Sequence, residues 1–373
     1  MCEDTKKLDS SATDFAFQGF QGVLLFNDSI FIESTEFRSG LLAWYRRHAR
    51  SLPWRESMDP YRILVSELML QQTQVATVLG YYRRWLDRFP TIGDLADADE
   101  ASVLCLWQGL GYYRRARNLH QCAKIIAGQF GERFPSTVEE LIKLPGVGRY
   151  TAGAIVSFAF DRPAPIVDGN IARVLSRLAN VHEPIDSPRG GRLIWELAGR
   201  FAQGTKPRLS NAALMELGAT LCSPRKPLCA LCPVKTFCRA QDPELLPLKK
   251  KRPAIEQRRE NYFFALRQGH VLLEQRAESR WQGLWTLPVL SESPDSGCAR
   301  SSEFPLVRVR HAVTRFAIHL CVFLREPPEK LGKGLEWKSL ASIEGLPMPS
   351  PHRRALKLAL KNQNYPGTRG GSY

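Results

Sequence analysis

Apolar residues recur at every third or fourth position through the first two thirds of the chain, from about Leu41 to Ala240. This period places them on one face of a helix, and no stretch alternates as a strand would, so we predict an all-α region. The helices are expected at residues 101–107, 116–130, 138–144, 151–160, 171–179 and 192–202. A further helix begins at Pro60, because Asp59 is a suitable N-cap and proline is favoured at the first helical position.

The pattern changes to an alternation of polar and apolar residues after about residue 257. Strands are expected at residues 262–266, 271–275 and 315–324, with a turn at Gln268-Gly269. Ser350-Pro351 then opens a last helix that runs to about Lys361. This second region is therefore predicted to be a small α+β domain.

Three prolines and a basic run, residues 249–252, separate the two regions, which is typical of an exposed linker. We therefore predict a multidomain protein. Its parts are an N-terminal extension at residues 1–38, a helical domain at 39–240, a linker at 241–256, an α+β domain at 257–361 and a flexible tail at 362–373. Within the extension, short β-like runs at residues 23–26 and 30–33 would form a small hairpin.

The chain is strongly basic. Its 52 lysine and arginine residues and 37 aspartate and glutamate residues leave a net charge of +15, which indicates a polyanionic partner, either a nucleic acid or an anionic membrane surface. No apolar run approaches the ~20 residues of a membrane-spanning helix, and the N-terminus lacks the basic and apolar parts of a secretory signal. We therefore expect a cytoplasmic protein without a membrane-spanning segment.

Four of the nine cysteines lie close together in the sequence, at Cys222, Cys229, Cys232 and Cys238. Such clustering argues against a secreted disulfide framework and favours one metal centre. Four thiolates bind either zinc or a [4Fe–4S] cluster, and the spacing alone does not separate the two. The basic residues in the loops between these cysteines would suit contact with phosphate.

A tight turn rich in glycine, residues 144–148, lies between two of the expected helices. Gly146 and Gly148 leave their backbone N–H groups unobstructed by side chains. Together with the N-terminus of the next helix, these donors would bind a phosphate group. A Gly-x-Gly turn can also serve only to cap a helix.

The string Leu-Pro-Gly-Val-Gly-Arg-Tyr-Thr-Ala at residues 144–152 resembles the endonuclease III superfamily of DNA glycosylases, as do Asp168 and the cysteine spacing downstream. The resemblance implies an all-α helix–hairpin–helix fold whose cysteine loop, residues 222–238, holds a [4Fe–4S] cluster. Bifunctional members carry a lysine after the hairpin as the amine nucleophile. Tyr150 occupies that position here, and because a phenol forms no Schiff base, we expect a monofunctional glycosylase.

Four further strings, at residues 52–55, 66–75, 107–113 and 167–170, resemble MutY-type adenine DNA glycosylases. The likeness extends from about residue 41 to 361, so it implies that the second domain is MutT-like, with a Nudix fold. The implied activity is removal of adenine mispaired with 8-oxoguanine or guanine in duplex DNA, the first step of base excision repair. The resemblance also implies a monomer that acts in the cytoplasm at the bacterial nucleoid.

Glu67 is the candidate general acid. It lies one helical turn from Ile63 and Leu70 and shares their partly apolar face, where burial would raise its pKa and keep it protonated near neutral pH. A protonated carboxyl group so placed can donate to N7 of adenine. From the residues alone a solvated helix carboxylate is the simpler interpretation, whereas the family resemblance implies the catalytic role.

Asp168 precedes the helix that is expected from Ile171, and its simplest interpretation is a helix N-cap. The resemblance implies that it is also the ionised carboxylate that stabilises the oxocarbenium-like sugar intermediate. The two roles agree, because the N-terminus of a helix favours a negative charge. Tyr150 and Asn170 match family residues that support this intermediate, although from the residues alone they are a packing aromatic and a second cap.

The resemblance also assigns contacts to DNA. Gln72 and Tyr112 match residues that insert near the opposite base once the target base has been flipped out of the duplex, a step that costs a few kcal/mol. The walls of the adenine pocket match Trp54, Arg55, Leu70 and Val75. The family pocket usually has a further Gln or Glu shortly before the cysteine loop, and Ala212 stands there instead, a departure that bears on how the edge of adenine is recognised.

The second domain lacks the glutamate-rich box with which Nudix hydrolases bind metal, so we expect it to bind and not to hydrolyse. Family members sense 8-oxoguanine with a Phe-Ser-His loop, and the matching string here is Val313-Thr314-Arg315. Thr314 keeps the hydroxyl group that would bond the damaged base. Arg315 would either contact phosphate or serve only as a charge at the start of a strand.

Two functions of other kinds stay open. A mismatch glycosylase for thymine or uracil would share the fold, but Glu67 and the second domain argue against it. A catalytically silent iron–sulfur module that only binds DNA would not need Glu67, Tyr150 and Asp168, all of which are present.

Overall fold

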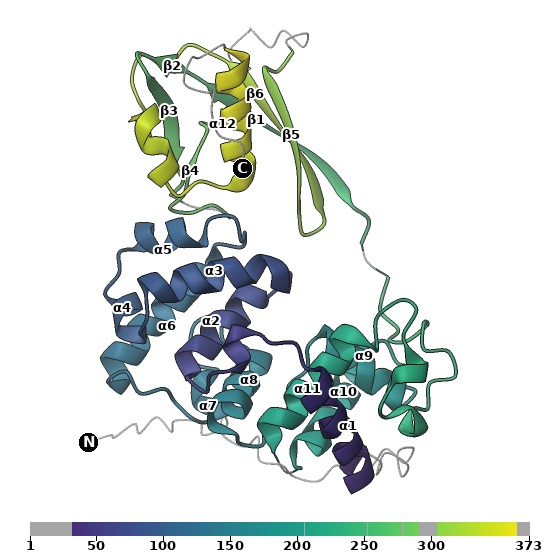
Figure 1. Cartoon of the computed structure of the whole chain (residues 1–373). Coiled ribbons are helices and arrows are strands. Elements are labelled where there is room, and N and C mark those ends of the chain that lie inside the picture. Colours follow the sequence, from purple (N-terminus) through teal and green to yellow (C-terminus); the bar gives the residue numbers. More distant parts are fainter. Residues whose placement is uncertain (1–31, 205, 252, 278–279, 291–303, 364–373) are drawn as a thin grey trace, which may run out of the picture.

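The computed structural model describes residues 32–204, 206–251, 253–277, 280–290 and 304–363. Helices fill the first part of the chain, and strands begin at Glu256, so the predicted order of an all-α domain and an α+β domain is confirmed (Figure 1). The hairpin expected near residues 23–33 falls almost entirely outside the described residues, as does most of the C-terminal tail. No helix in the described part of the chain is both long and apolar enough to cross a membrane.

The helical domain follows the apolar pattern closely. Its helices are α1 (Thr35–His48), α2 (Pro60–Leu70), α3 (Val75–Arg88), α4 (Ile92–Ala96), α5 (Glu100–Trp107), α6 (Arg114–Phe130), α7 (Val138–Leu141), α8 (Arg149–Phe160), α9 (Gly169–Leu178), α10 (Pro188–Ala202) and α11 (Pro207–Thr220). Short 3-10 turns are η2 (Pro53–Arg55), η3 (Cys229–Leu231) and η4 (Lys235–Phe237). The predicted cap of α2 is present, since Asp59 accepts a 2.8 Å hydrogen bond from the N–H of Tyr61.

The helices form two lobes with separate apolar cores. The first lobe comprises η2 and α2 to α8, and the second lobe comprises α1, α9, α10, α11 and the cysteine loop. Helix α1 packs against α11, which is far away in the sequence (Figure 1). It begins before the boundary expected at residue 39, and both Ile32 and Phe37 are fully buried in the second lobe. The apolar periodicity predicted α2 and α5 to α10 individually, but not α1, α3, α4 and α11. It also gave no sign that α1 packs in the second lobe, far from its neighbours in the sequence.

The second domain contains two small sheets. One has the strand order β1 (Glu256–Phe264), β6 (Phe316–Leu324), β5 (Val307–Val313), with β1 parallel to β6 and β5 antiparallel to it. The other joins β2 (Leu266–Arg267), β3 (His270–Gln275), β4 (Trp285–Thr286) and β7 (Leu335–Ser339). A 3-10 turn, η5 (Leu340–Gly345), and helix α12 (Ser350–Asn362) follow, and α12 packs on β5.

The structure corrects the sequence-based strands in part. The turn at Gln268-Gly269 is present, with positive φ at both residues (47° and 72°), as hairpin turns of this length require. Strand β1 begins at Glu256, within the predicted linker, because its exposed first half pairs with β6 and needs no apolar face of its own. Strands β4, β5 and β7 were not expected.

The two domains share one apolar core. Buried side chains of the second domain belong to the same cluster as those of the first lobe. The contact lies over α5 and the start of α6 (Figure 1), where the hydroxyl group of Tyr113 donates to the carbonyl of Met348 (3.3 Å) and Arg353 donates to Oε1 of Gln108 (3.1 Å).

The linker is less exposed than its composition predicts. Leu246 is buried, and the N–H of Ile185 donates to the carbonyl of Leu248 at 3.0 Å. Its first half therefore packs on the helical domain.

Candidate active site

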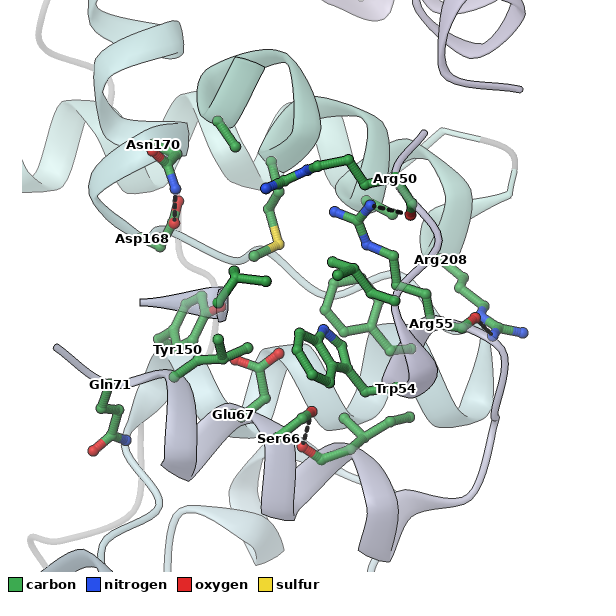
Figure 2. A pocket seen from close by; sticks show the side chains of 18 of the residues that line it. Arg50, Trp54, Arg55, Ser66, Glu67, Gln71, Tyr150, Asp168, Asn170 and Arg208 are labelled. Carbon is green, nitrogen blue, oxygen red and sulfur yellow. Dashed lines mark hydrogen bonds between the residues drawn. The ribbon is translucent and has the colours of Figure 1, made fainter. Parts of the chain in front are cut away.

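A cavity of about 850 Å³ lies between the two lobes (Figure 2). Helices α2 and α8 of the first lobe provide one side, and the start of α9 and one face of α11 in the second lobe provide the other. All four expected catalytic residues and all four expected wall residues line this cavity: Glu67, Tyr150, Asp168, Asn170, Trp54, Arg55, Leu70 and Val75. The fold thus brings together residues that are distant in the sequence.

Glu67 is only 5% exposed and points into the cavity from α2 (Figure 2). Burial raises the pKa of its carboxyl group to about 7, because the low-dielectric surroundings disfavour the charged form. A hydrogen bond with the hydroxyl group of Tyr150 acts in the opposite direction, and the charge of Asp168 raises the pKa further. Glu67 can therefore hold a proton near neutral pH and release it.

Asp168 occupies a different environment at the N-terminus of α9. It accepts hydrogen bonds from the N–H of Ile171 (2.7 Å) and from the amide of Asn170 (2.9 Å). Burial raises the pKa of Asp168, while these donors favour its ionised form and act against that rise. Arg173 holds the amide of Asn170 in this orientation through a 2.9 Å bond to its Oδ1. Two carboxyl groups in such unlike surroundings suit an acid and a charge-stabilising group.

The wall formed by Trp54 and Arg55 is attached to α11 by Glu216, which the sequence analysis did not select. The side chain of Glu216 is fully buried and binds Nε of Arg50 (2.7 Å) and Nη2 of Arg55 (2.6 Å). Arg208 adds a second attachment, since its Nη2 donates to the carbonyl of Arg55 at 2.7 Å. Glu216 could have been recognised from the sequence, because it is a single acidic residue in an otherwise apolar stretch of α11. Nothing in the sequence indicated the role of Arg208.

Ala212 lines the cavity, as its match to a pocket position of the family implies. Its neighbours on the same face of α11 are Leu209, Met215 and Ala219, which also line the cavity. This wall is therefore apolar, and it offers no carboxamide or carboxylate to the edge of a bound base.

Gln72 and Tyr112 lie at the ends of two neighbouring loops. Gln72 is exposed at the rim of the cavity, whereas Tyr112, 45% exposed, lies outside it. Both residues have a left-handed backbone, with φ of 55° and 46°. Non-glycine residues keep this conformation only where their surroundings impose it.

The hairpin between α7 and α8 has the expected geometry. Gly146 has a φ of 74°, and a Cβ there would lie 2.3 Å from Nδ2 of Asn118, so glycine is required. Gly148 is exposed and precedes α8 without a side-chain cap. The first N–H groups of α8 are therefore free to meet an anion, although phosphate binding here stays a prediction.

The four clustered cysteines line one cavity of about 370 Å³ beside α9. Within the described residues, no three His, Cys, Asp or Glu side chains come close enough to hold a single metal ion. Arg177 is fixed next to the thiols, donating to Sγ of Cys222 (3.2 Å) and to the carbonyl of Ser223 (2.8 Å). Four thiols that line one cavity are a donor set that suits either a [4Fe–4S] cluster or a tetrahedral zinc ion.

Thr314 is not part of the cavity. It lies in the exposed turn between β5 and β6, with a φ of 52°, and its hydroxyl group donates to the carbonyl of Val313 at 2.7 Å. This end of the hairpin points toward the helical domain (Figure 1). The side chain of Arg315 lies 3.7 Å from Glu256, so it has a partner within the sheet.

Two family models match the two domains of the chain. The HhH-GPD superfamily of base excision DNA repair proteins matches residues 65–197, and the NUDIX domain matches residues 261–358. The chain is 47% identical over 218 residues to human adenine DNA glycosylase, which covers 56% of this chain and 40% of the human one. It therefore spans less than half of that relative. A thermostable thymine-DNA glycosylase of known structure is 30% identical, with a TM-score of 0.49, covering 54% of this chain and 94% of that chain.

The alignment with a bacterial relative covers a larger share of both chains than the alignment with the human protein does. The adenine DNA glycosylase of Buchnera aphidicola subsp. Schizaphis graminum is 36% identical over 257 residues, which is 68% of this chain and 74% of that one. The match confirms the family that the sequence strings predicted, and the two domains have the expected folds. The chain belongs to the family of adenine DNA glycosylases.

Proposed function

We propose that this protein is a monofunctional DNA glycosylase that removes adenine paired with 8-oxoguanine or guanine in duplex DNA. The observation that carries the proposal is the carboxyl group of Glu67, buried in the cavity between the lobes with a pKa raised to about 7. An acid of this kind matches protonation of a leaving base at neutral pH. The family membership supports adenine as that base.

The proposed reaction is hydrolysis of the N-glycosidic bond. Glu67 donates its proton to N7 of adenine, which makes the base a better leaving group as the bond between C1′ and N9 breaks. Asp168, whose ionised form is favoured by hydrogen bonds from the N–H of Ile171 and the side-chain amide of Asn170, stabilises the positive charge that develops on the sugar. Water then adds to C1′ and gives up a proton to the Glu67 carboxylate, which restores the acid, and the products are free adenine and an abasic site.

The lining of the cavity supports a reaction without strand cleavage. Tyr150 stands where a lyase would need its amine, and none of the described residues that line the cavity is a lysine. A covalent Schiff base to the sugar therefore has no donor in the pocket. We expect borohydride to trap no covalent enzyme–DNA product and strand scission to require added alkali.

A [4Fe–4S] cluster held by Cys222, Cys229, Cys232 and Cys238 is part of the proposal. The cluster would give structure to a loop that carries Arg225, Lys226 and Lys235, whose charges suit phosphate contact. Protein purified without oxygen should be brown and contain iron and sulfide, and Cys232→Ser should lose both and bind DNA more weakly. Stoichiometric zinc without iron would overturn the assignment.

The substrate is duplex DNA, and the net charge of +15 supports such a partner. We propose that the protein acts as a monomer in the bacterial cytoplasm, where the chromosome lies. The Thr314 turn is the proposed contact with the 8-oxoguanine base, as the resemblance implies, and Gln72 and Tyr112 are proposed to fill the space that the flipped adenine leaves.

A glycosylase assay on four duplexes tests the function directly. Single-turnover excision should be fast for A:8-oxoguanine, slower for A:G, and absent for T:G and U:G. Excision of thymine or uracil alone would identify a mismatch glycosylase of another class. Binding of all four duplexes without excision would identify a silent DNA-binding module.

A further inference from the structure

Arg115 is a buried cation at the start of α6 that has no role in the reaction proposed above. It is the second residue of the helix and only 7% exposed, and burial lowers the pKa of its guanidinium group to about 10. In the described part of the chain, no carboxylate forms an ion pair with it. All its hydrogen-bond partners are neutral oxygen atoms, so hydrogen bonds and not a counter-charge compensate the burial of this cation.

One half of the guanidinium group binds the end of α2. Its Nη1 donates to the carbonyls of Leu68 (2.8 Å) and Met69 (3.0 Å) and to the carbonyl of Gln71. These carbonyls belong to the last turn of α2 and the residue after it, where no intrahelical donor remains. A positive charge is favourable at this end of a helix. Arg115 therefore caps the helix that carries Glu67.

The other half binds the loop that carries Tyr112. Its Nη2 donates to the carbonyls of Leu110 (3.0 Å) and Gly111 (3.3 Å), and also to Oγ1 of Thr73 (3.3 Å) in the loop after α2. The guanidinium carbon lies 5.4 Å from the ring centroid of Tyr112. One side chain thus holds the loop of Gln72 and the loop of Tyr112 against each other.

Both loops need such support. Gln72 and Tyr112 are exposed and have left-handed backbones. Residues other than glycine keep this conformation only when the surrounding structure holds them in it. A guanidinium group suits the task because its planar fork directs several donors in fixed directions. Lysine has a single ammonium group and would reach only some of these carbonyls.

We infer that Arg115 is the positioning residue that joins the Gln72 loop and the Tyr112 loop into one rigid wedge for opening the duplex. The inference rests on the proposed function, since it assumes that a base is flipped out. The wedge fills the space left by the flipped base only if both loops are correctly placed. A misplacement of about 1 Å can lower a rate by 10²-fold. Arg115 then acts on flipping and leaves the chemical step to Glu67.

The first test measures the loops in the free protein and needs no activity. In hydrogen–deuterium exchange, Arg115→Met should increase exchange in residues 68–74 and 108–113 together. Leu119→Ala is the control, because Leu119 is a fully buried residue of the same helix that belongs to neither loop. It should destabilise the domain without a selective effect on the loops. Unchanged exchange in both loops of Arg115→Met would overturn the inference.

The second test separates flipping from chemistry. Single-turnover excision is compared for adenine opposite 8-oxoguanine and for adenine opposite a stable abasic analogue, where no base pair has to be opened. Arg115→Met should lower the first rate about 10²-fold and the second less than 10-fold. Leu119→Ala should change both rates by the same factor. Equal losses on both duplexes in Arg115→Met would show a merely structural role.

Arg115→Lys keeps the inference testable if Arg115→Met does not fold. It should restore part of the excision of paired adenine and leave the two loops exchanging faster than in the unchanged protein. Full restoration would contradict the need for a fork that spans both loops. If the unchanged protein excises adenine from neither duplex, the proposed function fails, whereas the exchange measurement still decides whether Arg115 joins the loops.

Discussion

The cavity between the lobes and the turn at Thr314 differ in how far their polar groups are exposed to solvent. Glu67 is almost fully buried, and its pKa depends on the residues around it. Thr314 is exposed at the end of a hairpin, and its hydroxyl group donates to the carbonyl of the preceding residue. Burial makes electrostatic effects large and substitutions costly, whereas an exposed turn can change without disturbing a core. The reaction should therefore be far more sensitive to mutation than the preference for the opposite base.

Glu67→Gln should have the largest effect. It removes the proton donor but keeps the shape of the side chain, so excision of adenine opposite 8-oxoguanine should fall 10²–10⁴-fold while binding of the duplex persists. Single-turnover kinetics and duplex affinity check this. Glu196→Gln, at an exposed ion pair on α10, is the matched control and should leave excision unchanged. Near-normal excision by Glu67→Gln would be fatal to its role.

The same change made in each region sharpens the comparison. Glu216→Gln breaks the buried attachment of Arg50 and Arg55, while Glu260→Gln breaks the ion pair with Arg280 (2.6 Å) in the second domain. Arg50 is 41% exposed, so solvent weakens its ion pair with Glu216. We therefore expect Glu216→Gln to lower the free energy of unfolding by only about 1–2 kcal/mol. Excision should fall about 10-fold in this variant, because the pocket wall is released. Equal excision by the two variants would remove the distinction between the regions.

Tyr150→Phe should change the dependence of excision on pH. Excision requires the protonated form of Glu67, so it should fall as the pH rises above about 7. The hydrogen bond from Tyr150 lowers the pKa of Glu67, and without it the pKa rises. The decline should then begin about one pH unit higher, since a hydrogen bond to a charged group contributes about 1.5 kcal/mol. A decline at unchanged pH would show that Tyr150 does not tune the acid.

Thr314→Ala should have the smallest effect. One net hydrogen bond contributes about 1 kcal/mol, so the preference for A:8-oxoguanine over A:G should fall about fivefold. The measurement is the ratio of the two single-turnover rates. Thr314→Ser keeps the hydroxyl group and should keep the ratio. A ratio that Thr314→Ala leaves unchanged would mean that this turn does not sense the lesion.

Local patterns predicted much of the molecule. The N-cap at Asp59, the start of α9 after Asp168 and the turn at Gln268-Gly269 are encoded within a few residues, and the structure has all three. The alternation of valine and arginine at residues 307–310 signalled β5 in the same way but was not selected.

Other features depend on partners far away in the sequence. The capping of α2 by Arg115 leaves no sequence signal, because its partners are mostly backbone carbonyls, which every residue carries. Helix α1 joins a lobe whose other helices begin more than a hundred residues later. The roles of Glu67 and Asp168 came from the family resemblance, and the structure adds their unlike surroundings.

The core that crosses from the first lobe into the second domain has a consequence for how the protein comes apart. The first lobe and the second domain form one apolar cluster, and the second lobe forms another. We therefore expect the first lobe to unfold together with the second domain, and the second lobe to unfold separately. A protease that cuts between residues 249 and 255 would sever the chain without releasing the second domain. The fragments should migrate as one particle until the shared core unfolds.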